Sequence, residues 1–398
     1  MAKKILVIDD SALMRRVISD IINEGNDYEV AAIAKDGVEG FDLIVSNPNL
    51  YSAVILDINM PKMNGLELLK ELQKNRIEQT VIVVSTVAKQ GAKETIQALE
   101  YGAFDFVTKP ENYLETKGVA FKEAIHKMLD IATSSRASIE RTRVVRSRTT
   151  PLSATSRTTT TSRLGQNSSN ADRASAINAL RQRSMERNVA PAKIEASSLR
   201  NVKKNKKKIV ALACSTGGPK SLQQVIPVLP KSLDCGVVVV QHMPAGFTAS
   251  LAQRLDEMSQ VKVKEAAQGD IIKKGVVYIA PGGFHLKIVK AGTEYKIDLN
   301  KEPAIEGLRP CANIMYESLE NSDFDEITCV VLTGMGADGT KGIKGLVDKK
   351  KKIYVIAQDE DSCVVYGMPK AIAKTGLVNE VVPLNRIANS ITKNVGVI

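Results

Sequence analysis

Residues 209–219, IVALACSTGGP, join an apolar run to a serine and a glycine turn, and this pattern indicates the fold of the second half of the chain. Ile209–Ala213, Val237–Gln241 and Ile327–Leu332 are short runs rich in β-branched residues and bounded by turn residues. Such runs are typical of parallel strands that are covered on both faces. We therefore predict an α/β domain whose first strand leads through the turn into a helix beginning near Pro219.

A serine, a histidine and a carboxylate follow these three runs, at Ser215, His242 and Asp338. Because ligands bind beyond the carboxyl ends of strands in open α/β sheets, we expect these side chains to meet there. A serine becomes a nucleophile when an imidazole takes its proton, and a carboxylate holds that imidazole in the required tautomer. The set predicts a hydrolytic site. Of the other histidines, His285 is a rival base or lines the pocket, and His126 is structural.

Residues 1–131 alternate strand and helix patterns five times. This alternation predicts a second doubly wound parallel sheet. The fold class is therefore α/β, with two such domains. The predicted strands of this region are Ile5–Ile8, Glu29–Ile33, Ala53–Leu56, Val81–Val84 and Phe104–Val107.

Charged and hydroxyl side chains stand at the ends of these first-domain strands, at Asp9, Asp10, Asp57, Ser85 and Lys109. Three carboxylates at one edge repel one another unless a cation joins them, and their hard oxygen atoms suit Mg²⁺. A carboxylate can also form an acyl phosphate, whose charge a metal ion and a lysine would offset. We predict a magnesium site with Asp57 as the phosphoryl acceptor.

The net charge of +11 comes from residues 132–208, which hold 18 Lys or Arg and 4 Asp or Glu. The remaining residues carry 37 basic and 40 acidic side chains, a net charge of −3. Residues 132–207 are also rich in Ser and Thr and contain no aromatic residue, so we predict a disordered basic linker, with a marginal helix at 170–188. The linker is a solvated spacer or contacts an acidic partner or anionic surface.

Composition narrows the class of protein further. No run of 18 apolar residues occurs and the chain enters a strand pattern at once, which favours a cytoplasmic protein without membrane insertion. Five cysteines without a Cys-x-x-Cys pair fit reduced thiols. We expect three regions, with domains at 1–131 and 208–398 on either side of the linker.

The first region resembles the receiver domain of bacterial response regulators, in VIDDS (7–11), LDINMPKMNG (56–65) and VTKP (107–110). The resemblance implies a flavodoxin-like fold that a histidine kinase phosphorylates. It assigns phosphorylation to Asp57, Mg²⁺ ligation to Asp9, Asp10, Asp57 and the main-chain carbonyl of Asn59, phosphate contact to Lys109, and the switch hydroxyl to Ser85.

The last region resembles the catalytic domain of chemotaxis protein-glutamate methylesterases. The similar segments are STGGP (215–219), QHMPAGFTAS (241–250), APGGFH (280–285), LTGMGADG (332–339) and SCVVYGMP (362–369). The resemblance implies a Rossmann-like domain that hydrolyses glutamate γ-methyl esters on chemoreceptors without a cofactor, is activated by receiver phosphorylation, and also deamidates glutamine. Ser215 would be the nucleophile, His242 the base and Asp338 its orienting carboxylate.

The same resemblance implies further contacts. Thr216 would position the imidazole, main-chain N–H groups at the glycine turn and at Met335 would form the oxyanion site, and Arg309 would contact the acidic substrate surface. Three residues depart from the family pattern. Ala213 stands where glycine is frequent, and Cys311 and Asn313 replace the usual serine and aspartate.

The alternative function is a receiver-controlled regulator that binds nucleic acid or an acidic partner through the basic linker. That segment has no aromatic platform and no helix-turn-helix pattern, so we expect no nucleic-acid partner.

Overall fold

The computed structural model describes residues 2–110, 118–148 and 207–396, with only the helical backbone described for 135–148. The helix predicted at 170–188 and most of the predicted linker lie outside these ranges. None of the helices in the described residues is long and apolar enough to cross a membrane.

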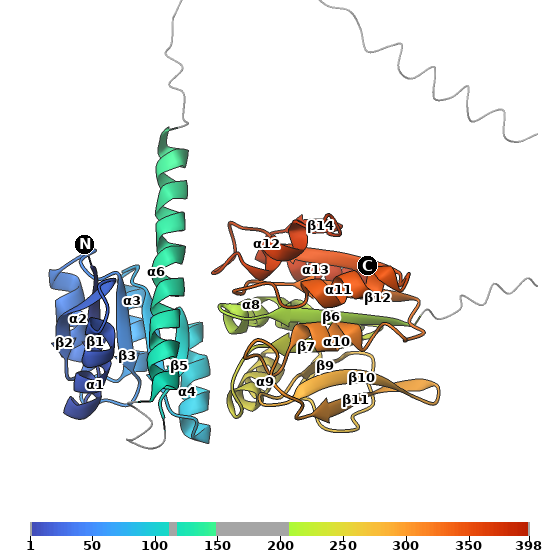
Figure 1. Cartoon of the computed structure of the whole chain (residues 1–398), viewed down its shortest axis with the longest axis horizontal. Helices are drawn as coiled ribbons and strands as arrows, with labels where there is room; N and C mark the ends of the chain where they lie inside the picture. The colour runs from blue at the N-terminus through green and yellow to red at the C-terminus, as the bar shows by residue number, and fades with distance from the viewer. Residues whose placement is uncertain (1, 111–117, 149–206, 397–398) are drawn as a thin grey trace, which may run out of the picture. The chain divides into compact units, whose positions relative to one another are not determined.

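The first domain is built on a five-stranded parallel sheet in the order β2-β1-β3-β4-β5. All five predicted strands are confirmed, and four helices cross between them (Figure 1). The strands are β1 (Lys3–Ile8), β2 (Tyr28–Ala34), β3 (Ala53–Asp57), β4 (Val81–Ser85) and β5 (Asp105–Thr108). The helices are α1 (Ala12–Asn23), α2 (Gly37–Ser46), α3 (Gly65–Lys74) and α4 (Lys89–Glu100).

The start of α3 holds the loop that follows Asp57. Asn64 accepts a hydrogen bond from the Glu67 N–H (2.9 Å), and the Glu67 carboxylate accepts one from the Asn64 N–H (2.8 Å), which is a complete capping box. A Cβ on Gly65 would lie 2.4 Å from the Asp57 carbonyl oxygen, so only glycine fits this close approach. The loop is thereby fixed beside the end of β3.

Helix α6 (Val119–Arg148) extends beyond residue 131, where we placed the end of the first domain. Phe121, Ile125 and Leu129 recur at helical spacing and are buried against the sheet. The helix continues through 132–148, which we had assigned to the disordered linker. A helix that tertiary packing has nucleated extends readily, since each added residue gains a hydrogen bond.

The second domain contains a seven-stranded parallel sheet in the order β14-β13-β12-β6-β7-β9-β8. The three predicted strands are its central members, and all residues of β7 and β12 are buried. This agrees with the apolar runs that predicted them. The strands are β6 (Lys208–Cys214), β7 (Gly236–Gln241), β8 (Lys262–Glu265), β9 (Val276–Ile279), β12 (Glu326–Val331), β13 (Ile353–Gln358) and β14 (Glu380–Val382).

Helices and one antiparallel hairpin complete this domain (Figure 1). The hairpin of β10 (His285–Ala291) and β11 (Glu294–Asn300) lies outside the predicted parallel pattern, and its Leu286, Ile288 and Ile297 are buried in the domain core. The other elements are α8 (Gly218–Val225), the short 3₁₀ helix η2 (Ile226–Val228), α9 (Phe247–Met258), α10 (Ala312–Glu317), α11 (Thr340–Asp348), α12 (Met368–Ala373) and α13 (Leu384–Val395).

The order in which successive strands join the sheet reverses at β6, which pairs with β7 on one side and with β12 on the other. In open α/β sheets the crevice at such a switch point is where ligands bind. Ser215, His242 and Asp338 all follow these three strands.

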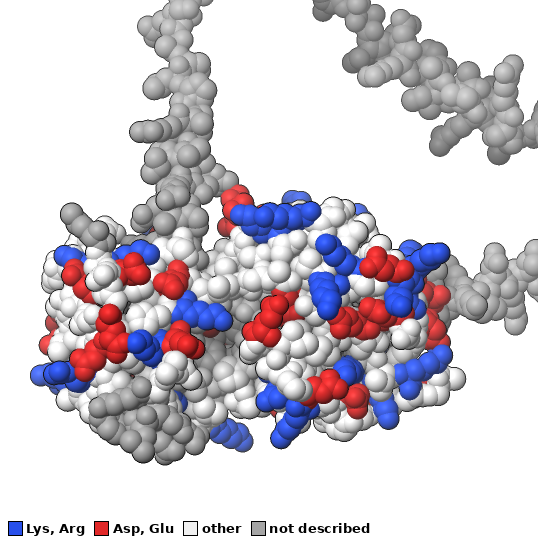
Figure 2. Space-filling model, in the orientation of Figure 1, with Lys and Arg blue, Asp and Glu red and all other residues white. Residues whose placement is uncertain are grey.

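Charge on the described residues is mixed. Figure 2 shows Lys and Arg side chains interspersed with Asp and Glu over the visible face. This matches the net charge of −3 outside residues 132–208, and a broad basic surface of the kind that binds nucleic acid is not seen on that face.

Candidate functional site

Strand register brings Ser215 beside His242. Cys214, the last residue of β6, pairs with Gln241, the last residue of β7. The residues that follow, Ser215 after β6 and His242 after β7, are therefore neighbours as well. The His242 N–H donates to the Cys214 carbonyl (3.2 Å), and the Ser215 N–H donates to the Thr333 carbonyl beyond β12 (3.0 Å). Ser215 is thus held between the ends of two neighbouring strands.

The turn after Ser215 is built by glycine. Gly217 has a φ of +76°, and α8 begins directly after it with Pro219 in its first turn, as predicted. The Gly218 N–H donates to the Ser215 carbonyl at 2.7 Å. Across the site, a Cβ on Gly334 would lie 2.8 Å from the Ser215 Cβ, so glycine there allows the loop after β12 to approach the serine.

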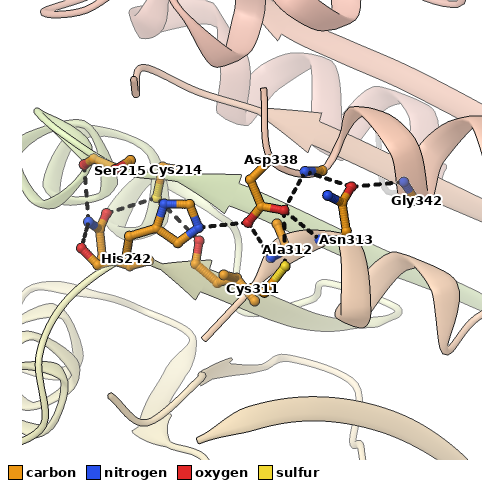
Figure 3. Close-up of polar contacts among 11 residues, drawn as sticks. Cys214, Ser215, His242, Cys311, Ala312, Asn313, Asp338 and Gly342 are labelled. Atoms are coloured by element: carbon orange, nitrogen blue, oxygen red, sulfur yellow. Dashed lines mark hydrogen bonds and ion pairs between the residues drawn. The ribbon is translucent and has the colours of Figure 1, made fainter. Parts of the chain in front are cut away.

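His242 and Asp338 form a buried pair. His242 Nε2 lies 2.8 Å from Asp338 Oδ2, and their side chains are 7% and 5% exposed (Figure 3). An ionised carboxylate can only accept hydrogen bonds, so Nε2 carries the proton and Nδ1 keeps its basic lone pair. Within the described residues, the buried Nδ1 has no hydrogen-bond partner. No hydrogen bond joins Ser215 Oγ to His242 there, and such contacts are often long before substrate binds.

Asp338 accepts hydrogen bonds from four groups besides His242. The donors are the main-chain N–H groups of Ala312 (2.6 Å), Asn313 (2.9 Å) and Gly339 (2.9 Å) and the Cys311 thiol (3.2 Å). Burial alone would raise the pKa of Asp338, but the hydrogen bonds from His242, Ala312 and Asn313 lower that pKa to about 2. Asp338 is therefore ionised and fixed in orientation at neutral pH.

Cys311 and Asn313, two of the departures from the family pattern, both contribute to this arrangement (Figure 3). Burial and the Asp338 charge raise the pKa of Cys311 to about 12, so its thiol stays a neutral donor. The Asn313 side-chain carbonyl accepts from the N–H groups of Gly339 (3.0 Å) and Gly342 (2.9 Å). Asp338 thus caps α10 while Asn313 caps α11. In the sequence, both residues are visible only as departures from the family pattern.

We expect Asp338 to contribute to stability in a pH-dependent way. Its folded-state pKa of about 2 lies below its ordinary value of 3.8. Its contribution is therefore complete above about pH 4 and is lost as the pH falls toward 2, with a full size of roughly 2 kcal/mol. The difference in unfolding midpoint between the wild type and Asp338→Asn should narrow as the pH falls from about 4 toward 2, because the unfolded wild-type chain protonates Asp338 there while the folded chain keeps it ionised.

The control for this experiment is Asp348→Asn, which neutralises an exposed carboxylate at the end of α11. A midpoint difference for Asp338→Asn that stays constant over the same pH range would contradict the assignment.

The remaining predicted residues have varied surroundings. His285, the rival candidate for the base, is buried at the start of β10, and its Nε2 lies 3.1 Å from the Pro303 carbonyl oxygen. The histidine that pairs with Asp338 is His242. Arg309 Nη1 donates to the carbonyls of Lys301 (3.2 Å) and Glu302 (3.1 Å), and so links the two ends of the loop that follows β11. Thr216 forms no hydrogen bond with His242 among the described residues.

Met335 follows Gly334 directly and its side chain is 46% exposed. The main-chain N–H groups of Met335, Thr216 and Gly217 form no hydrogen bond within the described part of the chain. They are the free donors nearest in sequence to Ser215 and to its neighbour Gly334.

The first domain gathers the predicted acidic cluster. Ligand oxygens of Asp9, Asp10 and Asp57 lie within 4.8 Å of one another. Lys109 Nζ is 2.9 Å from both Asp9 Oδ2 and Asp57 Oδ2. Burial raises the pKa of Asp57 although the Lys109 ammonium opposes the rise, and Asp9 adds to it. The pKa of Lys109 is raised despite its burial, because both carboxylates favour its charged form.

Two predicted residues complete this cluster's surroundings. Ser85 ends β4 and its hydroxyl donates to the Gly91 carbonyl in α4 (3.3 Å). Asn59 lies in the loop between β3 and α3, two residues beyond Asp57. Oxygen ligands of this kind, with Asp10 on the exposed side, fit a Mg²⁺ ion that retains water or phosphate ligands.

Comparison with known proteins gives the family. Residues 5–117 match the response regulator receiver domain, and residues 210–391 match the CheB methylesterase family. A protein-glutamate methylesterase/protein-glutamine glutaminase of Pyrococcus horikoshii is 38% identical over 99% of this chain and 94% of its own length. The chain belongs to this methylesterase family. The resemblance seen in the sequence is thereby confirmed.

Other members of the methylesterase family are similarly close. One from Syntrophomonas wolfei is 37% identical over 98% of both chains. Among solved structures, the Thermotoga maritima CheB methylesterase catalytic domain is 42% identical, covering 47% of this chain and 98% of that domain with a TM-score of 0.46. The response regulator domain of Thermotoga maritima CheB is 36% identical, covering 34% and 96%, with a TM-score of 0.29.

Proposed function

We propose that this chain is a receiver-controlled esterase that hydrolyses glutamate γ-methyl esters on chemoreceptors and so takes part in chemotactic adaptation. The observation that carries this proposal is the buried His242–Asp338 pair (2.8 Å), in which His242 follows β7, the strand that pairs with the one leading to Ser215. Membership of the methylesterase family supplies the substrate class. We assign esterase chemistry to 208–398, phosphorylation to 1–131, and a cytoplasmic location to the protein.

The acylation step uses the free nitrogen of His242. Ser215 Oγ attacks the ester carbonyl carbon while its proton passes to His242 Nδ1, and Asp338 stabilises the resulting imidazolium through Nε2. The negative charge on the carbonyl oxygen is met by the free N–H groups of Thr216, Gly217 and Met335. His242 Nδ1–H then protonates the departing methoxide, which leaves as methanol.

Deacylation repeats these steps with water. His242 Nδ1 takes a proton from the water, whose oxygen attacks the acyl carbon, and then returns the proton to Ser215 Oγ as the glutamate carboxylate is released. A glutamine side chain would form the same acyl-enzyme and release ammonia. We therefore propose glutaminase activity at the same site, with no cofactor in either step.

In the receiver, Asp57 accepts a phosphoryl group from the histidine kinase of the chemotaxis system. Mg²⁺ held by Asp9, Asp10, Asp57 and the Asn59 carbonyl would offset the phosphate charge. Lys109, which already contacts two of these carboxylates, would move to a phosphate oxygen. Ser85 supplies the switch hydroxyl, which must leave Gly91 to reach the phosphate.

The test is release of methanol from membranes that carry radiolabelled methylated chemoreceptor. We expect the wild-type chain to release methanol, and acetyl phosphate with Mg²⁺ to increase the rate. An excess of chelator should remove the increase and leave basal hydrolysis. Absence of methanol release under all of these conditions would refute the proposed activity. Salt-sensitive retention on duplex DNA would instead favour the nucleic-acid alternative.

A further inference from the structure

Gln241, the last residue of β7, is buried with its amide across the ends of β6 and β7. Its Nε2 donates to the main-chain carbonyls of Ser215 (3.0 Å) and His242 (3.1 Å). Its Oε1 accepts from the Cys214 thiol at 3.0 Å. One amide therefore joins the residue that bears the nucleophile to the residue that bears the base.

The orientation of this amide is fixed by its partners. Carbonyl oxygens only accept hydrogen bonds, so the amide nitrogen must face Ser215 and His242, and the thiol can donate to the oxygen. Exchanging the two ends would place Oε1 against two carbonyl oxygens. The space for the amide comes from Gly218, where a Cβ would lie 1.9 Å from Oε1. The absence of a side chain at Gly218 therefore leaves room for the Gln241 amide, in addition to the part that Gly218 takes in the turn after Ser215.

The same contacts restrict the peptide groups of both catalytic segments. The Ser215 carbonyl also accepts from the Gly218 N–H at 2.7 Å, so two donors hold it. Within the described residues, no other side chain donates to the carbonyls of both Ser215 and His242. A displacement of about 1 Å between reacting groups can cost about 100-fold in rate. A side chain that fixes the main chain of both Ser215 and His242 therefore affects the rate of proton transfer between them.

We propose that Gln241 is a positioning residue that holds Ser215 and His242 in the relative placement needed for proton transfer. This inference rests on the proposed function, in which Ser215 is the nucleophile. A buried amide is costly unless both of its ends are hydrogen-bonded. Here both amide protons go to main-chain carbonyls of the two catalytic residues.

The test compares two substitutions with a matched control. Gln241→Leu removes the amide, and Gln241→Glu keeps its shape but, when ionised, has no proton to donate. Thr328→Val is the control, because Thr328 is a buried polar residue in the first half of β12, away from the strand ends that carry Ser215 and His242, and its hydroxyl accepts a hydrogen bond from the Asn394 side chain (2.8 Å). Each full-length variant is treated with a fluorophosphonate, which labels an activated serine, and its melting temperature is measured.

We expect both Gln241 variants to lower the labelling rate of Ser215 and kcat by about 10- to 100-fold, with KM changed by less than about 3-fold. Thr328→Val should lower the melting temperature by a similar amount while the labelling rate per folded molecule changes by less than about 3-fold.

Three results would count against the positioning role or the proposed function, and they can be told apart. If folded Gln241→Leu or Gln241→Glu labels as fast as the wild type, Gln241 has no positioning role, although the proposed function stands. If the wild type itself is not labelled at Ser215, the proposed function fails. If Thr328→Val loses labelling to the same extent as the Gln241 variants, the effect is general loosening of the sheet, and the inference is wrong.

Discussion

Replacing Ser215 with alanine is expected to lower the rate of methanol release by about 10⁴-fold or more, because in the proposed mechanism its oxygen forms the acyl-enzyme. His242→Ala should have an effect of the same order, since no other base within the described residues contacts Asp338. Asp338→Asn is expected to cost about 10⁴-fold, because an amide cannot keep the proton of His242 on Nε2. The measurement is kcat for methanol release from methylated receptor.

Ser232→Ala is the control for the serine substitution, because it removes an exposed hydroxyl from the turn before β7. It should retain wild-type turnover. Ser215→Ala should also keep the wild-type melting temperature, since no side-chain hydrogen bond of Ser215 is lost within the described residues. Near-normal methanol release by a purified Ser215→Ala chain would show that the nucleophile has been assigned wrongly.

Asp57→Asn is expected to remove the response to phosphodonor while leaving basal hydrolysis intact. In the wild type, acetyl phosphate with Mg²⁺ should raise methanol release by about 5- to 150-fold, the usual range of coupling between two sites. The asparagine side chain cannot form an acyl phosphate, so the variant should stay at the basal rate. The two rates are measured with and without acetyl phosphate at fixed Mg²⁺.

Asp42→Asn makes the same charge change at an exposed position on α2 and should respond like the wild type. Stimulation of Asp57→Asn equal to that of Asp42→Asn would mean that Asp57 does not control the esterase. Loss of basal hydrolysis in Asp57→Asn would instead indicate a folding defect, which a lowered melting temperature would reveal.

The sequence determined the five strands of the first sheet, the three central strands of the second, and the predicted site residues that follow them. Buried parallel strands such as Val237–Gln241 are continuous apolar runs, so they are visible without any knowledge of their neighbours. Ser215 and His242 stand next to such runs, and strand order then places them together. Asp57 and Lys109 were found in the same way, and the structure brings the Lys109 ammonium to the Asp57 carboxylate at 2.9 Å.

The tertiary structure alone decided how these residues are held. Which nitrogen of His242 is free depends on Asp338 at 2.8 Å, 96 residues away in the chain. Cys311 and Asn313 were visible only as departures, and Gln241 only as the end of a strand, because hydrogen bonds between distant segments leave no periodic pattern. Local patterns fix where strands and turns form, whereas the orientation of a polar side chain is set by the donors and acceptors that packing brings to it.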